Sequence, residues 1–319
     1  MTENPFISVI VPTFNRKDML RQCLNSIFAQ TYSNFELIIV DNMSTDGTEE
    51  YVRNIPDKRI KYFRNPNNGV IAVNRNFGMH NAIGKFIAFC DDDDLWLPYK
   101  LEKQMAIFKQ YNNLQLVSSN AISFKDNKLV KLMSRQTNDI TLNIKILLQN
   151  NLIYNSTVLF KKDVITTIGY INENANICGA EDYDFWLHIA KSLENSIYVI
   201  AEPLILYRMH LKNFSDYNLD KDIDKLKLIL EKHTDVESTE RININIENKR
   251  NLLLLWYKLY ELDFKKTGII NFLFSKTSFV IKTRVLFYYL RGTITKVLGI
   301  YSYSIKNKPV IQKYLDSTL

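Results

Sequence analysis

The stretch FIAFCDDDD, residues 86–94, joins an uninterrupted apolar run to four consecutive aspartates. A short apolar run of this kind predicts a buried strand. Three earlier runs have the same character: ISVIV at 7–11, FELIIV at 35–40 and IKYF at 60–63. Segments with helical signals separate the runs, at residues 17–30, 48–52 and 74–82. This alternation of strand and helix predicts an α/β fold, with a parallel sheet covered by helices on both faces.

Polar side chains follow the predicted strands at the points where the strands end. The carboxyl ends of parallel strands share one edge of a sheet, and ligands bind outside that edge. The residues expected to meet there are Thr13, Asn15, Asp41, Asp91, Asp92 and Asp93. The sequence therefore predicts one site assembled from residues that lie far apart in the chain.

The length of the chain and the distribution of its charges both indicate two regions. Its 319 residues suit one large domain with a smaller second region. Strand signals fade after about residue 215, so we expect a domain over residues 1–215 and a helical, basic region over 216–319. Residues 251–319 hold 11 Lys and Arg against 3 Asp and Glu, whereas the rest of the chain holds 30 against 31. The near-neutral part that carries the motifs argues against nucleic-acid binding.

The cysteines and the basic C-terminal segment indicate in which part of the cell the protein works. No secretory leader is visible, and the three cysteines have no metal-ligand spacing, so we expect reduced thiols in a cytoplasmic protein. The longest uncharged stretches near the end, 267–275 and 297–305, are too short to cross a bilayer. Two interpretations of residues 251–319 stay open. They form a helical subdomain, or they make a peripheral contact with anionic lipid at the inner face of the cytoplasmic membrane.

The four aspartates at 91–94 require a counter-charge. Adjacent carboxylates repel one another, and apolar residues flank these on both sides, which argues against a solvated acidic run. Hard oxygen ligands of this kind suit Mg²⁺ or Mn²⁺, which also bind substrate phosphates. Neither GxxxxGK[ST] nor GxGxxG occurs, so we expect the metal to hold most of the phosphate charge.

Two later motifs are ambiguous on local grounds. In EDYDFW, residues 181–186, Asp182 fits either a helix cap or a general base that deprotonates a hydroxyl. In YRMH, residues 207–210, His210 fits a structural role better than a ligand role, although it lies where it could reach a metal or a diphosphate.

Taken together, the motifs resemble those of the family 2 inverting glycosyltransferases. The matching segments are SVIVPTFNR at 8–16, VDNMSTDGT at 40–48, NG at 68–69, NRNFG at 74–78, GKFIAFCDDDD at 84–94, EDYDFWL at 181–187 and YRMH at 207–210. They cover about residues 6–215 in the family's order. The resemblance implies the GT-A fold, a Rossmann-like, mostly parallel sheet flanked by helices, followed here by a helical C-terminal extension.

The resemblance also implies roles for single residues. Nucleotide-sugar contacts would come from Pro12, Thr13, Asn15, Asp41, Arg75, Asp91 and Asp92. Among them, Asp41 would bind the base, and Asp91 or Asp92 the ribose. Asp93 would bind Mn²⁺ or Mg²⁺, with His210 helping to bind the metal or the diphosphate, and Asp182 would be the catalytic base. Many relatives have a second aspartate where this chain has Asn42. An amide can still form hydrogen bonds, so we expect the activity to be kept.

The activity implied is transfer of a hexose or N-acetylhexosamine from a UDP-sugar, with inversion, to a hydroxyl of a saccharide acceptor. Family habit and the basic tail suggest a lipid-linked acceptor, such as a polyprenyl-diphosphate sugar in bacterial surface-polysaccharide synthesis. Two alternatives stay open. A nucleotidyltransferase also joins a parallel sheet to a metal, but it usually has a Gly-rich basic loop near the N-terminus. A nucleotide-sugar-binding protein without catalysis would have no need of Asp93 and Asp182.

Overall fold

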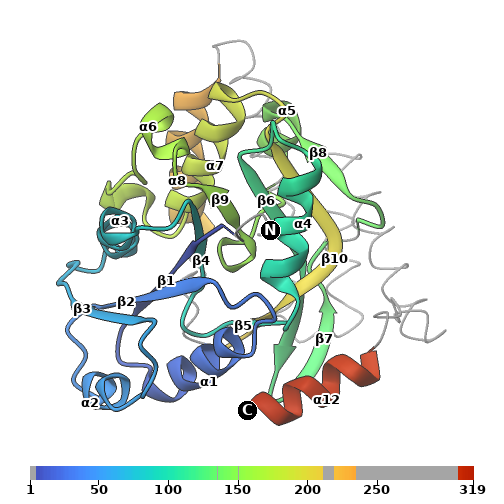
Figure 1. Ribbon diagram of the computed structural model, residues 1–319. Coiled ribbons are helices and arrows are strands. Elements are labelled where there is room, and N and C mark those ends of the chain that lie inside the picture. The colour runs from blue at the N-terminus through green and yellow to red at the C-terminus, as the bar shows by residue number, and fades with distance from the viewer. Residues whose placement is uncertain (1–4, 135, 150, 211–218, 235–307) are drawn as a thin grey trace, which may run out of the picture. The chain divides into compact units, whose positions relative to one another are not determined.

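A computed structural model describes residues 5–134, 136–149, 151–210, 219–234 and 308–319. The chain forms two compact units, one made of residues 1–216 with 306–319 and the other of residues 217–305. In the second unit, the described element is helix α8 (Leu219–His233). Within the described residues, the first unit holds a ten-stranded sheet with helices packed on it (Figure 1).

Four parallel strands form one half of the sheet, in the spatial order β3, β2, β1, β4. Their bounds are Ile60–Arg64, Phe35–Asp41, Ile7–Thr13 and Phe86–Phe89. β1 lies in the middle, because Ile7 pairs with Phe35 on one side and with Phe86 on the other. The four strands predicted from the sequence are confirmed. Their parallel pairing brings the carboxyl ends of β1, β2 and β4 to one edge.

The other half of the sheet is mixed. β9 (Leu159–Lys161) runs antiparallel to β4 and to β6 (Leu116–Lys125), whereas β10 (Ile197–Arg208) runs parallel to β6. Three short antiparallel strands complete the sheet: β5 (Leu95–Trp96) and β8 (Ile140–Leu142) on β10, and β7 (Lys128–Leu132) on β6. The fold is therefore α/β, as expected, but its strands do not all run in one direction.

The helices of the first unit cover both faces of the sheet (Figure 1). They are α1 (Lys17–Phe28), α2 (Thr48–Arg53), α3 (Ile71–Asn81), α4 (Lys100–Gln110), α5 (Ile144–Gln149), α6 (Val164–Ile168), α7 (Glu181–Ser192) and α12 (Lys308–Thr318), with single 3₁₀ turns at Asn155–Thr157 and Ala175–Ile177. The helices predicted at 17–30 and 48–52 are confirmed. The helix predicted at 74–82 begins three residues earlier.

The alternation of side chains along β1 decides which helices lie on which face. Val9 belongs, with Ile7 and Val11, to a hydrophobic core that also contains residues of α1 and α4. Ile10 points to the other face, where α3 approaches so closely that a Cβ on Gly78 would lie 2.5 Å from Ile10 Cγ2. On that face the ring of Phe160 contacts the rings of Phe89 in β4 and Phe185 in α7. The first turn of α7 is thereby fixed beside the ends of the central strands.

β10 is much longer than the apolar run with which it begins, residues 197–200. It continues through Pro203 to Arg208, and its pairing with β6 shifts register on either side of Pro203. A proline has no N–H to donate to the ladder, so a strand that contains one needs such an irregularity. The extension matters because it places Tyr207 and Arg208 beside the loop of aspartates.

The C-terminal helix α12 belongs to the first unit, whereas the sequence predicts that residues 306–319 are part of the helical, basic C-terminal region. Tyr314 donates a hydrogen bond from its hydroxyl to the carbonyl of Trp96 at 2.9 Å, and Gln312 bonds the backbone of Asn127 and Leu129. In the described part of the chain, no helix is long and apolar enough to span a bilayer. Most of the segment expected to touch a membrane, residues 251–307, lies outside the described residues.

Candidate active site

The carboxyl ends of β1 and β4 open into a polar cavity of about 210 Å³. The first turn of α7 and the end of β10 complete its wall. The residues that line it are Pro12, Arg16, Ile71, Arg75, Asp91, Asp92, Asp93, Asn155, Gly179, Glu181, Asp182 and Tyr207. Two buried polar atoms of this wall, Arg75 Nε and Asn155 Oδ1, have no hydrogen-bond partner. Such atoms suit a polar ligand, because a buried polar group without a partner is costly.

Asp92 is held deep in the wall by two residues from the end of β1. Its Oδ2 accepts a hydrogen bond from Thr13 Oγ1 at 2.7 Å, and its Oδ1 accepts one from Arg16 Nη1 at 3.1 Å. Burial and the neighbouring charge of Asp93 raise the pKa of Asp92 to about 7. These contacts leave Asp92 better placed to orient the loop than to bind a ligand freely.

Asp93 is the aspartate that meets the end of β10. Its Oδ2 lies 2.9 Å from His210 Nε2 and accepts a hydrogen bond from Arg16 Nη1 at 2.8 Å. His210 and Asp93 are separated by 117 positions in the chain. The structure thus brings together the two residues expected to serve a metal.

Asp91 and Glu181 are joined by a buried arginine. Arg75 in α3 is 4% exposed and donates to Glu181 Oε1 and, at 2.8 Å, to Asp91 Oδ1. Asn155 adds a bond of 2.9 Å to the same oxygen of Asp91. This bridge ties the loop after β4 to the first turn of α7, and Arg75 is enclosed by carboxylates.

Asp94 supports the loop from inside. It is 1% exposed, and its Oδ1 accepts a hydrogen bond from the backbone N–H of Arg208 at 3.0 Å. The Arg208 side chain then donates from Nε to the carbonyl of Asp93 at 2.8 Å. Burial, with the charge of Asp93, raises the pKa of Asp94 well above its ordinary range.

Asp182 lies in the first turn of α7 and lines the cavity. The cap position of this helix is Ala180, which makes no side-chain capping bond, so Asp182 is not the cap residue. Its carboxylate accepts a hydrogen bond from the N–H of Tyr183. Burial first, and then the adjacent charge of Glu181, raise the pKa of Asp182 to about 7. A carboxylate with a pKa near neutrality suits a general base.

The residues expected to contact the nucleotide are placed unevenly. Pro12 lines the cavity, whereas Asn15 lies on the surface, where it accepts a hydrogen bond from the N–H of Thr45. Asp41 is fully buried, and it accepts hydrogen bonds from the N–H of Ser44 and the hydroxyl of Tyr62. Asp41 therefore does not line the cavity, and its role as a contact of the base stays a prediction.

Asn42 departs from the family pattern and has a structural task. Its Oδ1 accepts a hydrogen bond from the N–H of Asn67 at 2.9 Å, and its own N–H donates to the carbonyl of Thr13. The side-chain amide at this position thus connects the loops that follow β2 and β3.

Six residues of the cavity wall have no role predicted from the sequence, and four of them carry polar side chains: Arg16, Asn155, Glu181 and Tyr207. Arg16, Glu181 and Tyr207 stand inside the quoted motifs, so their position was the available signal. Asn155 lies in a 3₁₀ turn after an uninformative segment, and nothing in its local sequence marks it.

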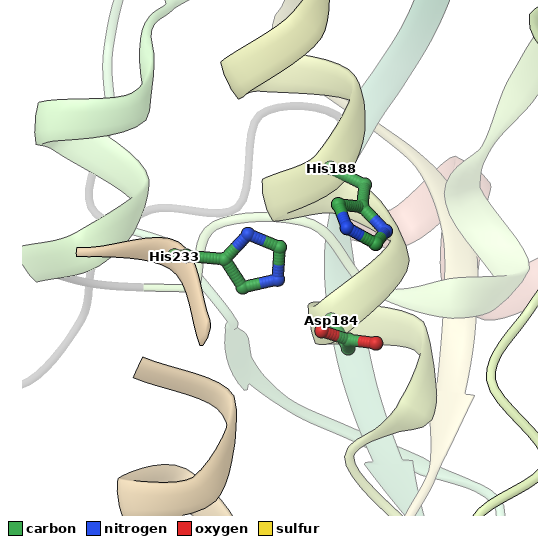
Figure 2. Close-up of side chains that lie close together, drawn as sticks. All are labelled: Asp184, His188 and His233. Carbon is green, nitrogen blue, oxygen red and sulfur yellow. The ribbon is translucent and has the colours of Figure 1, made fainter. Parts of the chain in front are cut away.

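A further acidic residue and a histidine lie outside the cavity wall. Asp184 and His188 are one turn apart on α7 (Figure 2). Asp184 is buried and accepts a hydrogen bond of 3.4 Å from Asn172 Nδ2. His233, also drawn in Figure 2, lies in the last turn of α8 and belongs to the second unit.

Comparison with known proteins identifies the family. The family model described as glycosyl transferase family 2 matches residues 8–168, which is half of the chain. The chain belongs to glycosyltransferase family 2. An uncharacterised glycosyltransferase of Haemophilus influenzae is 36% identical over 60% of this chain and 75% of its own length. A longer uncharacterised glycosyltransferase of Rickettsia conorii is 45% identical over 33% of this chain and 18% of its own length.

One relative of this glycosyltransferase has a named reaction. WfgD of Escherichia coli, a UDP-Glc:α-D-GlcNAc-diphosphoundecaprenol β-1,3-glucosyltransferase, is 33% identical over 66% of this chain and 78% of its own length. Two solved structures share the fold. Staphylococcus aureus TarS 1–349 in complex with UDP-GlcNAc has a TM-score of 0.62 at 20% identity, covering 81% of this chain and 76% of TarS 1–349. A Pyrobaculum calidifontis mannosyltransferase with GDP-Man and Mn²⁺ has a TM-score of 0.58 at 16% identity, covering 99% and 86%.

Proposed function

We propose that this glycosyltransferase moves a hexose or N-acetylhexosamine from a UDP-sugar to a hydroxyl of a saccharide acceptor, with inversion at the anomeric carbon. The observation that carries the proposal is that Asp182, a carboxylate with a pKa raised to about 7, lines the same cavity as Asp93 with its partner His210. The UDP-GlcNAc complex of TarS and the UDP-Glc donor named for WfgD support the donor class.

The residues at the cavity fit a divalent cation. Five carboxylates line it against the two guanidinium groups of Arg16 and Arg75, so negative charge is in excess. Asp93 Oδ2 and His210 Nε2 lie 2.9 Å apart. Adjacent ligand atoms of an octahedral ion with bonds near 2.1 Å are separated by about 3 Å, so these two atoms suit one ion. Mn²⁺ or Mg²⁺ bound there would neutralise the charge that develops on the departing diphosphate.

The chain's own residues supply the remaining chemistry. The Asp182 carboxylate takes the proton of the acceptor hydroxyl as that oxygen attacks the anomeric carbon from the face opposite the diphosphate. The C–O bond to the diphosphate breaks, and the nucleoside diphosphate leaves with the bonding pair. The bridge from Glu181 through Arg75 to Asp91 keeps the base at a fixed place relative to the acidic loop. A donor linked in the α configuration would give a β-glycoside.

The test is a panel of UDP- and GDP-sugars in the presence of Mn²⁺, scored by release of nucleoside diphosphate and by the anomeric configuration of the product. We expect Asp182→Asn to lower release by about 10²–10⁴-fold, and Glu194→Gln, an exposed change beyond the other end of α7, to leave it unaltered. Near-normal turnover by Asp182→Asn would overturn the assignment. Pyrophosphate release from a nucleoside triphosphate and a sugar phosphate, supplied in a parallel assay, would identify a nucleotidyltransferase. Donor binding without turnover would identify a binding protein.

We propose a polyprenyl-diphosphate-linked saccharide as the acceptor, as in bacterial surface-polysaccharide synthesis, and the inner face of the cytoplasmic membrane as the place of work. The acceptor named for WfgD supports this class. Comparing a free oligosaccharide with the same sugar on a polyprenyl diphosphate tests the acceptor. Sedimentation with anionic vesicles, before and after truncation following Lys249, tests whether the basic segment attaches the enzyme to lipid.

A further inference from the structure

Arg16 occupies an unusual place in the cavity, between two carboxylates of the acidic loop. One nitrogen, Nη1, lies 2.8 Å from Asp93 Oδ2 and 3.1 Å from Asp92 Oδ1. The residue immediately precedes α1, and its side chain is 27% exposed where it borders the cavity. The proposed mechanism gives Arg16 no task.

The oxygen that Arg16 contacts is the oxygen best placed to bind the cation. Asp93 Oδ2 lies 2.9 Å from His210 Nε2, and this pair of atoms fits the proposed ion. An ion on Oδ2 would take up a lone pair of that oxygen and would set a double positive charge beside the guanidinium. Like charges at such short range repel strongly in a partly buried site. Arg16 and the cation therefore compete for Asp93.

The other arginines of the site are held differently. Arg75 is buried between Glu181 and Asp91, and Arg208 contacts Asp93 through the backbone carbonyl. Arg16, in contrast, places a guanidinium nitrogen 2.8 Å from an oxygen of the Asp93 carboxylate itself. Its second contact, to Asp92 Oδ1, keeps the guanidinium at the cavity wall when Asp93 is taken by an ion.

We infer that Arg16 is a positioning residue that competes with the divalent cation for Asp93 and thereby couples cation binding to binding of the donor's diphosphate. The inference rests on the proposed function for the presence of both ligands. A guanidinium displaced from Asp93 gains a new anionic partner only when a diphosphate enters the cavity, and Arg is well suited to that partner. Cation and nucleotide then each raise the affinity of the other by the same factor.

The experiment measures binding by the full chain, with Mn²⁺ and UDP as the probes. Isothermal titration gives the Kd of Mn²⁺ without UDP and at saturating UDP, and the Kd of UDP at saturating Mn²⁺. The variants are Arg16→Gln and, as a control, Arg21→Gln, which removes the same charge from the exposed surface of α1. Arg16→Lys keeps the charge without the planar fork and serves as a second variant if the glutamine variant does not fold.

The two ligands are expected to respond in opposite directions. Without UDP, Arg16→Gln should bind Mn²⁺ about five- to tenfold more tightly than wild type, and at saturating Mn²⁺ it should bind UDP more weakly by a similar factor. The control should match wild type in both titrations. Unchanged or weaker Mn²⁺ binding by Arg16→Gln would overturn the inference.

Failure of the proposed function gives a different result. If wild type takes up no Mn²⁺, or if Asp93→Ala binds it as wild type does, the cation assignment itself is wrong. If Mn²⁺ binding depends on Asp93 but does not respond to Arg16, only the role of Arg16 is wrong.

Discussion

Replacing Glu181 with glutamine should move the pH dependence of sugar transfer, because Glu181 helps to set the pKa of the catalytic base. The pKa of Asp182 stands at about 7 rather than 3.8, through burial first and the charge of Glu181 second, while Arg75 acts against both. The Glu181→Gln change removes the second cause and leaves Arg75 with one carboxylate partner fewer. Both effects favour the ionised form of Asp182, so its pKa must fall.

The size of the effect follows from the charge removed. A like charge on an adjacent, partly screened carboxylate is worth about 1.4 kcal/mol, which is about one pH unit. With a pKa near 7, about a tenth of the base is ionised at pH 6, and with a pKa near 6 about half is ionised. The acid limb of kcat/KM should therefore move to lower pH by about one unit. The plateau at high pH should fall, because a weaker base accepts a proton less readily.

The assay is nucleoside-diphosphate release between pH 5 and pH 9 at fixed ionic strength and saturating Mn²⁺. Glu194→Gln removes a carboxylate from an exposed position beyond α7 and should leave the limb in place. A Glu181→Gln enzyme that folds normally but keeps the limb of wild type would refute the reasoning. So would a shift to higher pH, since that sign requires Glu181 to stabilise the ionised form.

Three further predictions concern the metal, the packing and a buried amine. Asp93→Ala should abolish Mn²⁺ binding and sugar transfer, with calorimetry and donor turnover as the measurements. Gly78→Val should lower the free energy of unfolding in urea by about 2 kcal/mol, because even a Cβ meets Ile10 Cγ2 at 2.5 Å. Burial lowers the pKa of Lys100 to about 7. Between pH 7 and about pH 10 the unfolded state therefore binds one proton more than the folded state. The free energy of unfolding of wild type should therefore rise by about 2 kcal/mol relative to that of Lys100→Met between pH 7 and pH 9. Urea unfolding that shows no such rise would contradict the lowered pKa of Lys100.

The sequence by itself determined the elements that depend on local pattern. Apolar runs and helical signals gave the four parallel strands and the first two helices, because strand and helix formation follow from neighbouring residues. The aspartates after β4 marked the place of the site, since carboxyl ends of parallel strands meet at one edge. The motif series also indicated the family to which the chain belongs.

Only the tertiary structure decided which contacts each carboxylate of the site makes. The four aspartates look alike in sequence, yet Asp94 faces the interior, Asp92 is held by Thr13, and Asp93 meets His210 from 117 positions away. The pKa of Asp182 depends on burial and on charges that surround it in space. The antiparallel direction of β9 and the return of α12 to the first unit likewise rest on contacts between distant segments. Such contacts depend on which surfaces pack together, and no local stretch of sequence contains that information.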